Sequence, residues 1–246
     1  MTKKSRLDNL LVARGFFPSR EQAQRAIMAG DVKIGTRVAT KPSDLLGPDE
    51  EVAVAAALKY VGRGGLKLAS ALDFFQIDVS SKIALDIGAS TGGFTDCLLQ
   101  RGATKVYAVD VGHGQLAWKI RRDPRVIVLE KLNARFLSPE QIPEAVDICV
   151  IDVSFISLTL ILANAFQLLS PEGAILALIK PQFELERGDV GRGGVVRNPE
   201  LHQKAKQKIV DFVTDLGHVV IGIAPSAVAG RDGNQEFFAC LRKRSV

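Results

Sequence analysis

Short apolar runs alternate with helical patterns over most of the chain. Near-continuous apolar runs at 83–88, 105–110, 126–130, 147–152 and 174–180 predict parallel strands that are buried on both faces. Helical spacing predicts a short helix to about Arg101, one over about 157–169 that stops at Pro171-Glu172-Gly173, and one from an Asn198 cap to Gly217. No helical segment separates 218–224 from 236–242, so these last strands should pair antiparallel. The order predicts an α/β fold with an open, mostly parallel sheet and helices on both faces.

The first 58 residues follow a different pattern. A helical period runs from Leu7 to Gly15, and a second helix runs from a Ser19 capping box to Gly30. Alternation at 32–38 around Gly35-Thr36 predicts a hairpin with a type II′ turn, and residues 51–55 predict another strand. We therefore expect a small N-terminal α+β domain that is too small for a deep core.

The positive charge is concentrated in this first region. Residues 1–43 hold nine basic and three acidic residues, a net charge of +6, whereas the whole 246-residue chain carries +5. Such asymmetry points to nucleic acid or another anionic surface as partner, although a merely solubilising basic face would look the same. If the partner is RNA, the expected phosphate contacts are Arg6, Arg20, Arg25, Lys33 and Arg37.

Overall composition is that of a globular protein, with 47% hydrophobic and 24% charged residues. Cys97, Cys149 and Cys240 lie far apart among apolar neighbours, which predicts buried free thiols in a cytoplasmic protein and no metal site. The first residues show no signal-peptide pattern. Residues 146–169 are long enough to cross a bilayer, but Asp147 and Asp152 interrupt them, so a strand followed by a helix explains the segment better.

A glycine-rich segment, DIGASTGGF, lies where the first sheet strand meets a helix, which is where ligands bind in such sheets. The loop lacks the early glycine of a GxGxxG dinucleotide fingerprint. Asp110 ends the second strand and could accept hydrogen bonds from both ribose hydroxyls of an adenosine ligand. The pattern favours S-adenosylmethionine over a glycine turn without nucleotide. The expected cofactor contacts here are Asp86, Gly88, Ala89, Ser90, Gly92, Gly93, Phe94, Asp110, Val111 and Asp152.

Four further charged residues are candidates for a functional site. Asp152 and Lys180 close the fourth and fifth sheet strands, where open-sheet sites form. A lysine after five apolar residues is costly to bury without a function, although a snorkelling strand end is the alternative. Glu236, at the start of the last strand, and Lys67, near the start of a helix, would each be interpreted alone as solvated surface residues.

Several motifs in order resemble the TlyA family: VGRGGLKL, DIGASTGGFTD, AVDVGHGQLAWK, IDVSFISL, LIKPQFE and GNQEFF. That family joins an RNA-binding domain of the ribosomal small-subunit protein four (S4) type to an FtsJ-like methyltransferase, and it carries an old hemolysin label. The resemblance implies an RNA-binding domain at 1–58 and a Rossmann-like methyltransferase domain at 59–246. It also implies that Lys67, Asp152, Lys180 and Glu236 form the catalytic tetrad, with Asn133 at the adenine-contact position. The implied reaction is S-adenosylmethionine-dependent 2′-O-methylation of a cytidine ribose in ribosomal RNA. The implied partner is ribosomal RNA or a ribosomal subunit, and no membrane association is expected.

These residue types suit that chemistry. A ribose hydroxyl is a weak nucleophile, so the enzyme must align it with the methyl group and remove its proton. A lysine is a base at neutral pH only where burial or a nearby positive charge lowers its pKa. We expect Lys180 to act as the base, Asp152 to orient it, and Lys67 and Glu236 to hold the target nucleotide.

Other segments are candidates for RNA contact. A loop at 186–194 contains four glycines together with Arg187 and Arg192, which with Arg63 are expected to contact RNA phosphates. Trp118 and Phe183 could stack on a base, although core packing is the simpler expectation for both. Two other functions remain possible: a pore-forming hemolysin, or a non-catalytic RNA-binding factor in ribosome assembly.

Overall fold

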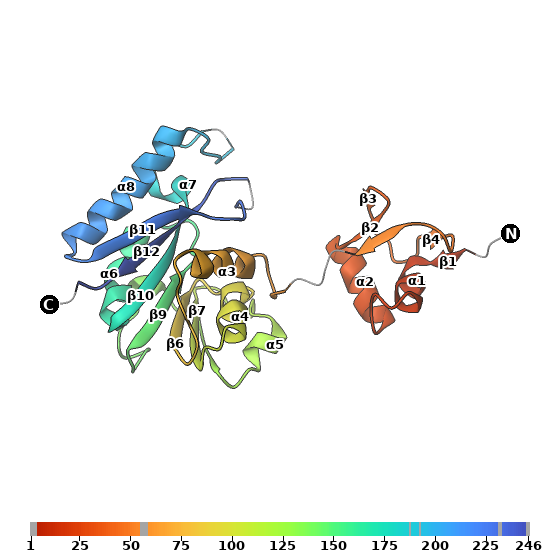
Figure 1. Cartoon of the computed structure of the whole chain (residues 1–246), viewed down its shortest axis with the longest axis horizontal. Helices are drawn as coiled ribbons and strands as arrows, with labels where there is room; N and C mark the ends of the chain where they lie inside the picture. The colour runs from red at the N-terminus through yellow and green to blue at the C-terminus, as the bar shows by residue number, and fades with distance from the viewer. Residues whose placement is uncertain (1–3, 55–58, 187, 192, 231–232, 245–246) are drawn as a thin grey trace. The chain divides into compact units, whose positions relative to one another are not determined.

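The computed structural model describes residues 4–54, 59–186, 188–191, 193–230 and 233–244 (Figure 1). The chain divides into two compact units, Met1–Lys59 and Tyr60–Val246. The predicted domain boundary after residue 58 falls at residues 55–58, which lie outside the described residues.

The described residues of the first unit form two helices and five short strands. α1 (Leu7–Ala13) and α2 (Arg20–Ala29) follow β1 (Ser5–Arg6), and Ser19 caps α2 by accepting a hydrogen bond from the Gln22 backbone N–H. β2 (Val32–Ile34) pairs antiparallel with β3 (Arg37–Val38) and β5 (Val52–Val54), while β4 (Leu45–Leu46) pairs with β1. The predicted helix, helix and hairpin are confirmed. The first unit has its own small core, which includes Leu7, Leu11 and Ile27.

The second unit is built on a seven-stranded sheet of order β11-β12-β10-β9-β6-β7-β8. Its strands are β6 (Ile83–Ile87), β7 (Lys105–Asp110), β8 (Val126–Glu130), β9 (Val146–Ile151), β10 (Leu169–Ile179), β11 (Val219–Pro225) and β12 (Phe237–Arg242). The first five pair in parallel, and β12 runs antiparallel to both β10 and β11. The predicted fold class is confirmed.

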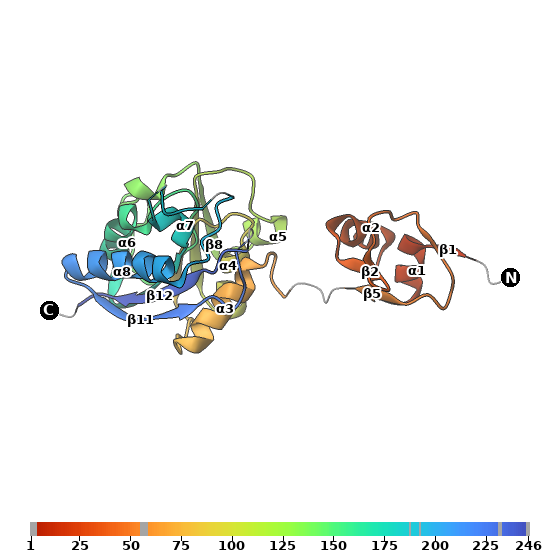
Figure 2. The ribbon, with the colours of Figure 1, turned by 90° about the horizontal axis from the view of Figure 1, so that it is seen from above.

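Helices cover both faces of this sheet (Figures 1 and 2). One core contains residues of α6 (Leu162–Leu168) and α8 (Pro199–Asp215), and the other contains residues of α3 (Gly64–Phe74), α4 (Gly93–Gln100) and α5 (Trp118–Arg121). β6 lies between β7 and β9, so the chain reverses its direction of winding there. Such a switch point leaves a crevice beyond the carboxyl ends of the strands, where the predicted site residues cluster.

The segment from residue 134 to 179 differs in detail from the sequence prediction. Two 3-10 turns, η1 (Ala134–Phe136) and η2 (Leu158–Leu160), were not predicted, and the expected 157–169 helix is η2 followed by α6. Pro171-Glu172-Gly173 does not follow the helix as a separate turn, because β10 already begins at Leu169. The register shift between Leu169 and Ala174 lets the strand take up the proline. Across the described part of the chain, no helix is long and apolar enough to span a membrane.

Candidate active site

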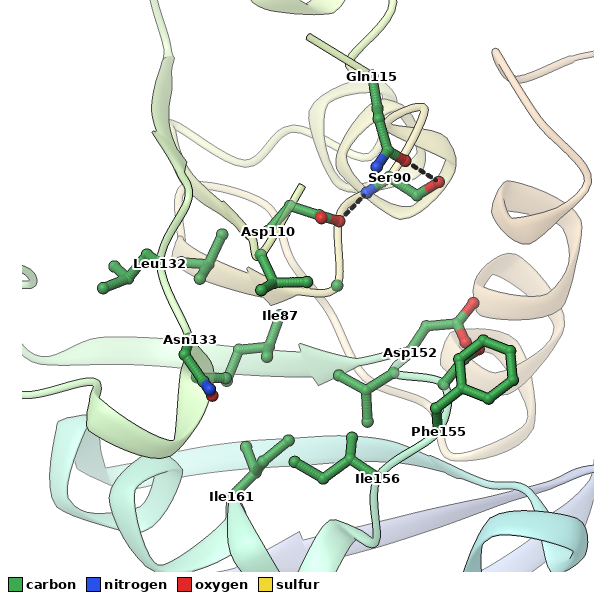
Figure 3. Close-up of a pocket in the computed structure, with 16 residues that line it drawn as sticks. Ile87, Ser90, Asp110, Gln115, Leu132, Asn133, Asp152, Phe155, Ile156 and Ile161 are labelled. Atoms are coloured by element: carbon green, nitrogen blue, oxygen red, sulfur yellow. Dashed lines mark hydrogen bonds between the residues drawn. The ribbon is translucent and has the colours of Figure 1, made fainter. Parts of the chain in front are cut away.

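A cavity of about 450 Å³ lies at the switch point, beyond the ends of β6, β7 and β9 (Figure 3). Six of the predicted cofactor residues line it: Gly88, Ser90, Asp110, Val111, Asn133 and Asp152. Apolar side chains such as Ile87, Leu132 and Ile161 form much of the remaining wall. An apolar cleft with a few polar groups is typical of a small-molecule site.

The glycine loop and the end of β7 are fixed to each other by hydrogen bonds. The backbone N–H groups of Ser90 and Gly112 donate to Asp110 Oδ2 and Oδ1 at 2.8 and 2.7 Å, which holds the carboxylate in one orientation at the cavity wall. The bond from Ser90 is drawn in Figure 3. Gly88 has φ +88°, and a Cβ there would come within 2.3 Å of the Asp152 carbonyl oxygen. Only glycine allows the two strand ends to approach this closely.

The other predicted cofactor residues lie elsewhere. Ala89, Gly93 and Phe94 line a smaller cavity of about 160 Å³ with Gly62–Gly64, whereas Gly92 packs against Leu116. Asp86 is fully buried behind the loop, where its Oδ2 accepts a hydrogen bond from Thr95 Oγ1 at 2.6 Å. Burial raises the pKa of Asp86 to about 7; the hydrogen bond from Thr95 opposes this rise, and the nearby Asp152 adds to it. Asp86 is thus placed to support the loop from behind.

A second cavity, of about 850 Å³, brings together the four residues of the predicted tetrad. Lys180 Nζ lies 2.7 Å from Asp152 Oδ1, and Lys67 Nζ lies 2.6 Å from Glu236 Oε2. Both lysine side chains are only 11% exposed, so each ion pair is largely shielded from bulk water. The residues come from α3, the ends of β9 and β10, and the start of β12.

The two cavities share part of their walls. Ser90, Asp152, Ser154 and Phe155 line both. A ligand in the first cavity would therefore lie next to the lysine–carboxylate pairs in the second. That is the arrangement needed to transfer a group from a bound cofactor to a second substrate.

Ser154 and Glu184 are site residues that sequence reasoning missed. Lys180 Nζ donates to Ser154 Oγ at 2.9 Å, so the lysine has a neutral partner beside Asp152. Glu184 is buried in α7 (Pro181–Glu184), where its carboxylate accepts hydrogen bonds from Ser157 Oγ and the Leu158 N–H at 2.5 and 2.8 Å. It thereby ties the segment after Asp152 to the segment after Lys180. Nothing in the spacing of these residues marks such a contact.

Phe155 and Trp118 are exposed aromatic side chains of the second unit, and Phe155 lines the second cavity. Phe155 is 91% exposed, has φ +65°, and lies with its ring centroid 5.0 Å from that of Phe183. Positive φ is rare for a bulky side chain and indicates local strain of the kind found at functional sites. Core packing was the wrong expectation for Trp118, which is 69% exposed and lies beneath the Arg122 guanidinium.

The predicted RNA contacts differ in their surroundings. Arg25, Lys33 and Arg37 are exposed in the first unit, and Arg37 is paired with Asp44 at 3.2 Å. Arg6 and Arg20 both contact the buried Asp8. Arg63 lines the tetrad cavity, whereas Arg187 and Arg192 lie outside the described residues.

Cys97, Cys149 and Cys240 are buried and free, as predicted. The described side chains include no group of three or more His, Cys, Asp or Glu residues able to hold a metal ion.

Comparison with known proteins gives the family. Residues 60–243 match the FtsJ-like methyltransferases, and residues 5–52 match the S4 domain. YqxC of Bacillus subtilis is 48% identical over 98% of this chain and 86% of its own. The 16S/23S rRNA (cytidine-2′-O)-methyltransferase TlyA of Mycobacterium tuberculosis is 44% identical over 100% of this chain and 92% of its own. The chain belongs to the TlyA family of FtsJ-like methyltransferases.

The family resemblance predicted from the motifs is thereby confirmed. The solved structure of a hemolysin-named protein from Streptococcus thermophilus is 43% identical with a TM-score of 0.77, and the match covers 100% of this chain and 90% of that one. TlyA-family proteins therefore carry both methyltransferase and hemolysin names. The two matched domains correspond to the two compact units of the structure.

Proposed function

We propose that this protein transfers a methyl group from S-adenosylmethionine to the 2′-hydroxyl of a cytidine ribose in ribosomal RNA. The observation that carries the proposal is the pairing of Lys67 with Glu236 and of Lys180 with Asp152 in a cavity that shares a wall with the switch-point cavity. The name of the Mycobacterium tuberculosis relative supplies the nucleotide and the RNA class.

The switch-point cavity suits S-adenosylmethionine. Asp110 accepts two backbone N–H groups yet keeps further acceptor positions for ribose hydroxyls, and Gly88 allows the ligand to lie against bare backbone. Asn133, the residue that the family resemblance places at the adenine, lines the cavity beside Leu132. Gln115, whose Oε1 accepts a hydrogen bond from Ser90 Oγ at 3.4 Å, is an additional wall residue. The bound cofactor supplies an electrophilic methyl group on a sulfonium.

Lys180 is placed to manage the proton of the ribose hydroxyl. Asp152 and Ser154 fix the position of its Nζ. Once Lys180 has passed its own proton to the Asp152 carboxylate, the neutral amine can accept the hydroxyl proton as the oxygen attacks. Lys67 and Glu236 lie across the same cavity and hold the target nucleotide. Phe155, exposed at the junction of the two cavities, offers an aromatic face for the base.

The first unit supplies RNA affinity in this proposal, and the boundary between the two functions lies near residue 58. An activity on ribosomal RNA also implies a cytoplasmic protein.

The hemolysin alternative has less support, because the long apolar segment at 146–169 is divided between β9, η2, α6 and the start of β10, with Asp152 at the tetrad. A non-catalytic assembly factor would not need two paired lysines beside a cofactor cavity.

The test is transfer of a labelled methyl group from S-adenosylmethionine to purified small and large ribosomal RNAs, to each subunit and to whole ribosomes. We expect label on a cytidine ribose in at least one of these substrates. Absence of transfer to all of them, with S-adenosylmethionine bound, would contradict the proposal. The Asp152→Ala variant, purified in parallel, controls for contaminating methyltransferases.

A further inference from the structure

One buried carboxylate in the first unit holds two arginines. Asp8 lies in the first turn of α1 and is fully buried. Its carboxylate accepts hydrogen bonds from Arg6 Nε and Nη2 at 3.0 and 2.9 Å, from Arg20 Nε at 2.9 Å and from Gln24 Nε2 at 2.7 Å. Arg6 is the last residue of β1, whereas Arg20 and Gln24 lie one turn apart on α2. Three elements therefore meet at Asp8.

The arginines themselves are not buried. Their side chains are 39% and 50% exposed, although the carboxylate between them is inaccessible to water. Asp8 engages one edge of Arg6 and only the Nε of Arg20. A guanidinium has five N–H donors, so each arginine keeps donors that Asp8 does not engage. Two such groups held side by side match the several acceptor oxygens of a phosphodiester.

Charge balance supports a ligand at this position. Two permanent positive charges face one negative charge, so the cluster has a net charge of +1 and attracts an anion. The hydrogen bond from Arg6 keeps the pKa of Asp8 well below its usual value, so the carboxylate stays ionised at neutral pH. Long flexible side chains lose rotamer freedom on binding, and arginines already fixed in place lose less.

We propose that Asp8 is a positioning residue for RNA binding, which holds Arg6 and Arg20 as a rigid pair of guanidiniums for a phosphate of the RNA backbone. The inference rests on the proposed function, because that function makes RNA the partner of this unit. It also reverses the expectation from charge alone. From charge alone, removing a carboxylate from a strongly basic region should tighten RNA binding. The positioning role predicts instead that loss of the Asp8 carboxylate weakens it.

The experiment compares two Asp→Asn variants of the full-length protein with equal changes in charge. Asp8→Asn removes the buried carboxylate, and Asp49→Asn removes an exposed one from the same unit. Binding to purified small and large ribosomal RNA is measured by filter retention across about 50 to 200 mM salt. We expect Asp8→Asn to bind about fivefold to tenfold more weakly, since the two arginines lose their fixed geometry. Asp49→Asn should bind as tightly as wild type or more tightly.

A structural role of Asp8 is separated from positioning by a mutant cycle. In an Arg6→Gln/Arg20→Gln background, Asp8→Asn should cause no further loss of RNA affinity, because the groups through which it acts are gone. An equal loss in that background would mean that Asp8 merely stabilises the unit, and would overturn the inference. So would unchanged or tighter binding by Asp8→Asn in the wild-type background.

Wild-type methyl transfer distinguishes the two proposals. If the wild-type protein methylates ribosomal RNA and Asp8→Asn binds RNA normally, only the role of Asp8 fails. If the wild-type protein neither binds nor methylates ribosomal RNA, the proposed function fails, and the role of Asp8 fails with it.

Discussion

The two units of this protein arrange opposite charges in different ways. In the methyltransferase unit, two lysines face two carboxylates, one to one, at 2.6 and 2.7 Å. In the first unit, a single carboxylate faces two arginines. Lysine can give up its proton when its surroundings favour the neutral amine, whereas arginine stays charged at any physiological pH. The choice of cation therefore suits proton transfer in one unit and anion binding in the other.

Burial follows the same division. The tetrad lysines are nearly buried and line a cavity, while Arg6 and Arg20 are partly exposed around a buried acid. In the first arrangement the cation is shielded and, in the proposed reaction, acts on one bound atom. In the second the anion is shielded, and the cations are presented outward. The following predictions test this contrast, beginning with the largest expected effect.

Lys180→Ala should lose about 10²- to 10⁴-fold in the rate of methyl transfer, as expected for removal of a positioned base. Single-turnover transfer at saturating cofactor and RNA measures this loss, and calorimetry should show unchanged S-adenosylmethionine affinity. Lys180→Arg should not restore the rate, because a guanidinium cannot accept the proton. Full activity of Lys180→Arg would show that only positive charge matters here, which would remove the contrast with the arginine cluster.

Asp152→Ala should lose a comparable amount, and the Asp152→Ala/Lys180→Ala double variant should be little slower than either single variant. The two groups are in contact and act as a unit, so their effects should not add. The same single-turnover assay measures the coupling between the Asp152 and Lys180 substitutions. Multiplicative losses in the double variant would instead assign Asp152 a separate task, such as contact with the cofactor.

Sequence and structure agree best where one strand end decides the position. Asp110 and Asp152 could be located from the apolar runs that precede them, because the carboxyl ends of parallel strands meet at one edge. The partnership of Lys67 with Glu236 could not, since 169 positions separate them and only the family resemblance joined them. Asp8 was passed over because an acid in a basic segment looks like part of the solvated surface. Phe155 was missed because its positive φ and its exposure are both features that no propensity of phenylalanine predicts.

Asp110→Ala should weaken S-adenosylmethionine binding by about tenfold or more, since a hydrogen bond to a charged group contributes about 1.5–3 kcal/mol. The variant also frees the Ser90 and Gly112 N–H groups, which loosens the glycine loop. Calorimetric titration measures the affinity. Because Asp110 belongs to the cofactor cavity alone, RNA affinity should not change, and equal losses for both ligands would indicate general unfolding.

The smallest expected effect is that of salt on the saturated rate, and set beside the effect of salt on RNA affinity it compares the two clusters directly. Between about 50 and 200 mM salt, affinity for ribosomal RNA should fall steeply, because exposed cations such as Arg6 and Arg20 release counterions on binding phosphate. The single-turnover rate at saturating RNA should change by less than about twofold, because the Lys180–Asp152 pair is nearly buried and weakly screened. Rates and affinities are measured on the same preparation. A saturated rate that falls in parallel with affinity would mean that the tetrad also acts mainly as an exposed phosphate-binding surface.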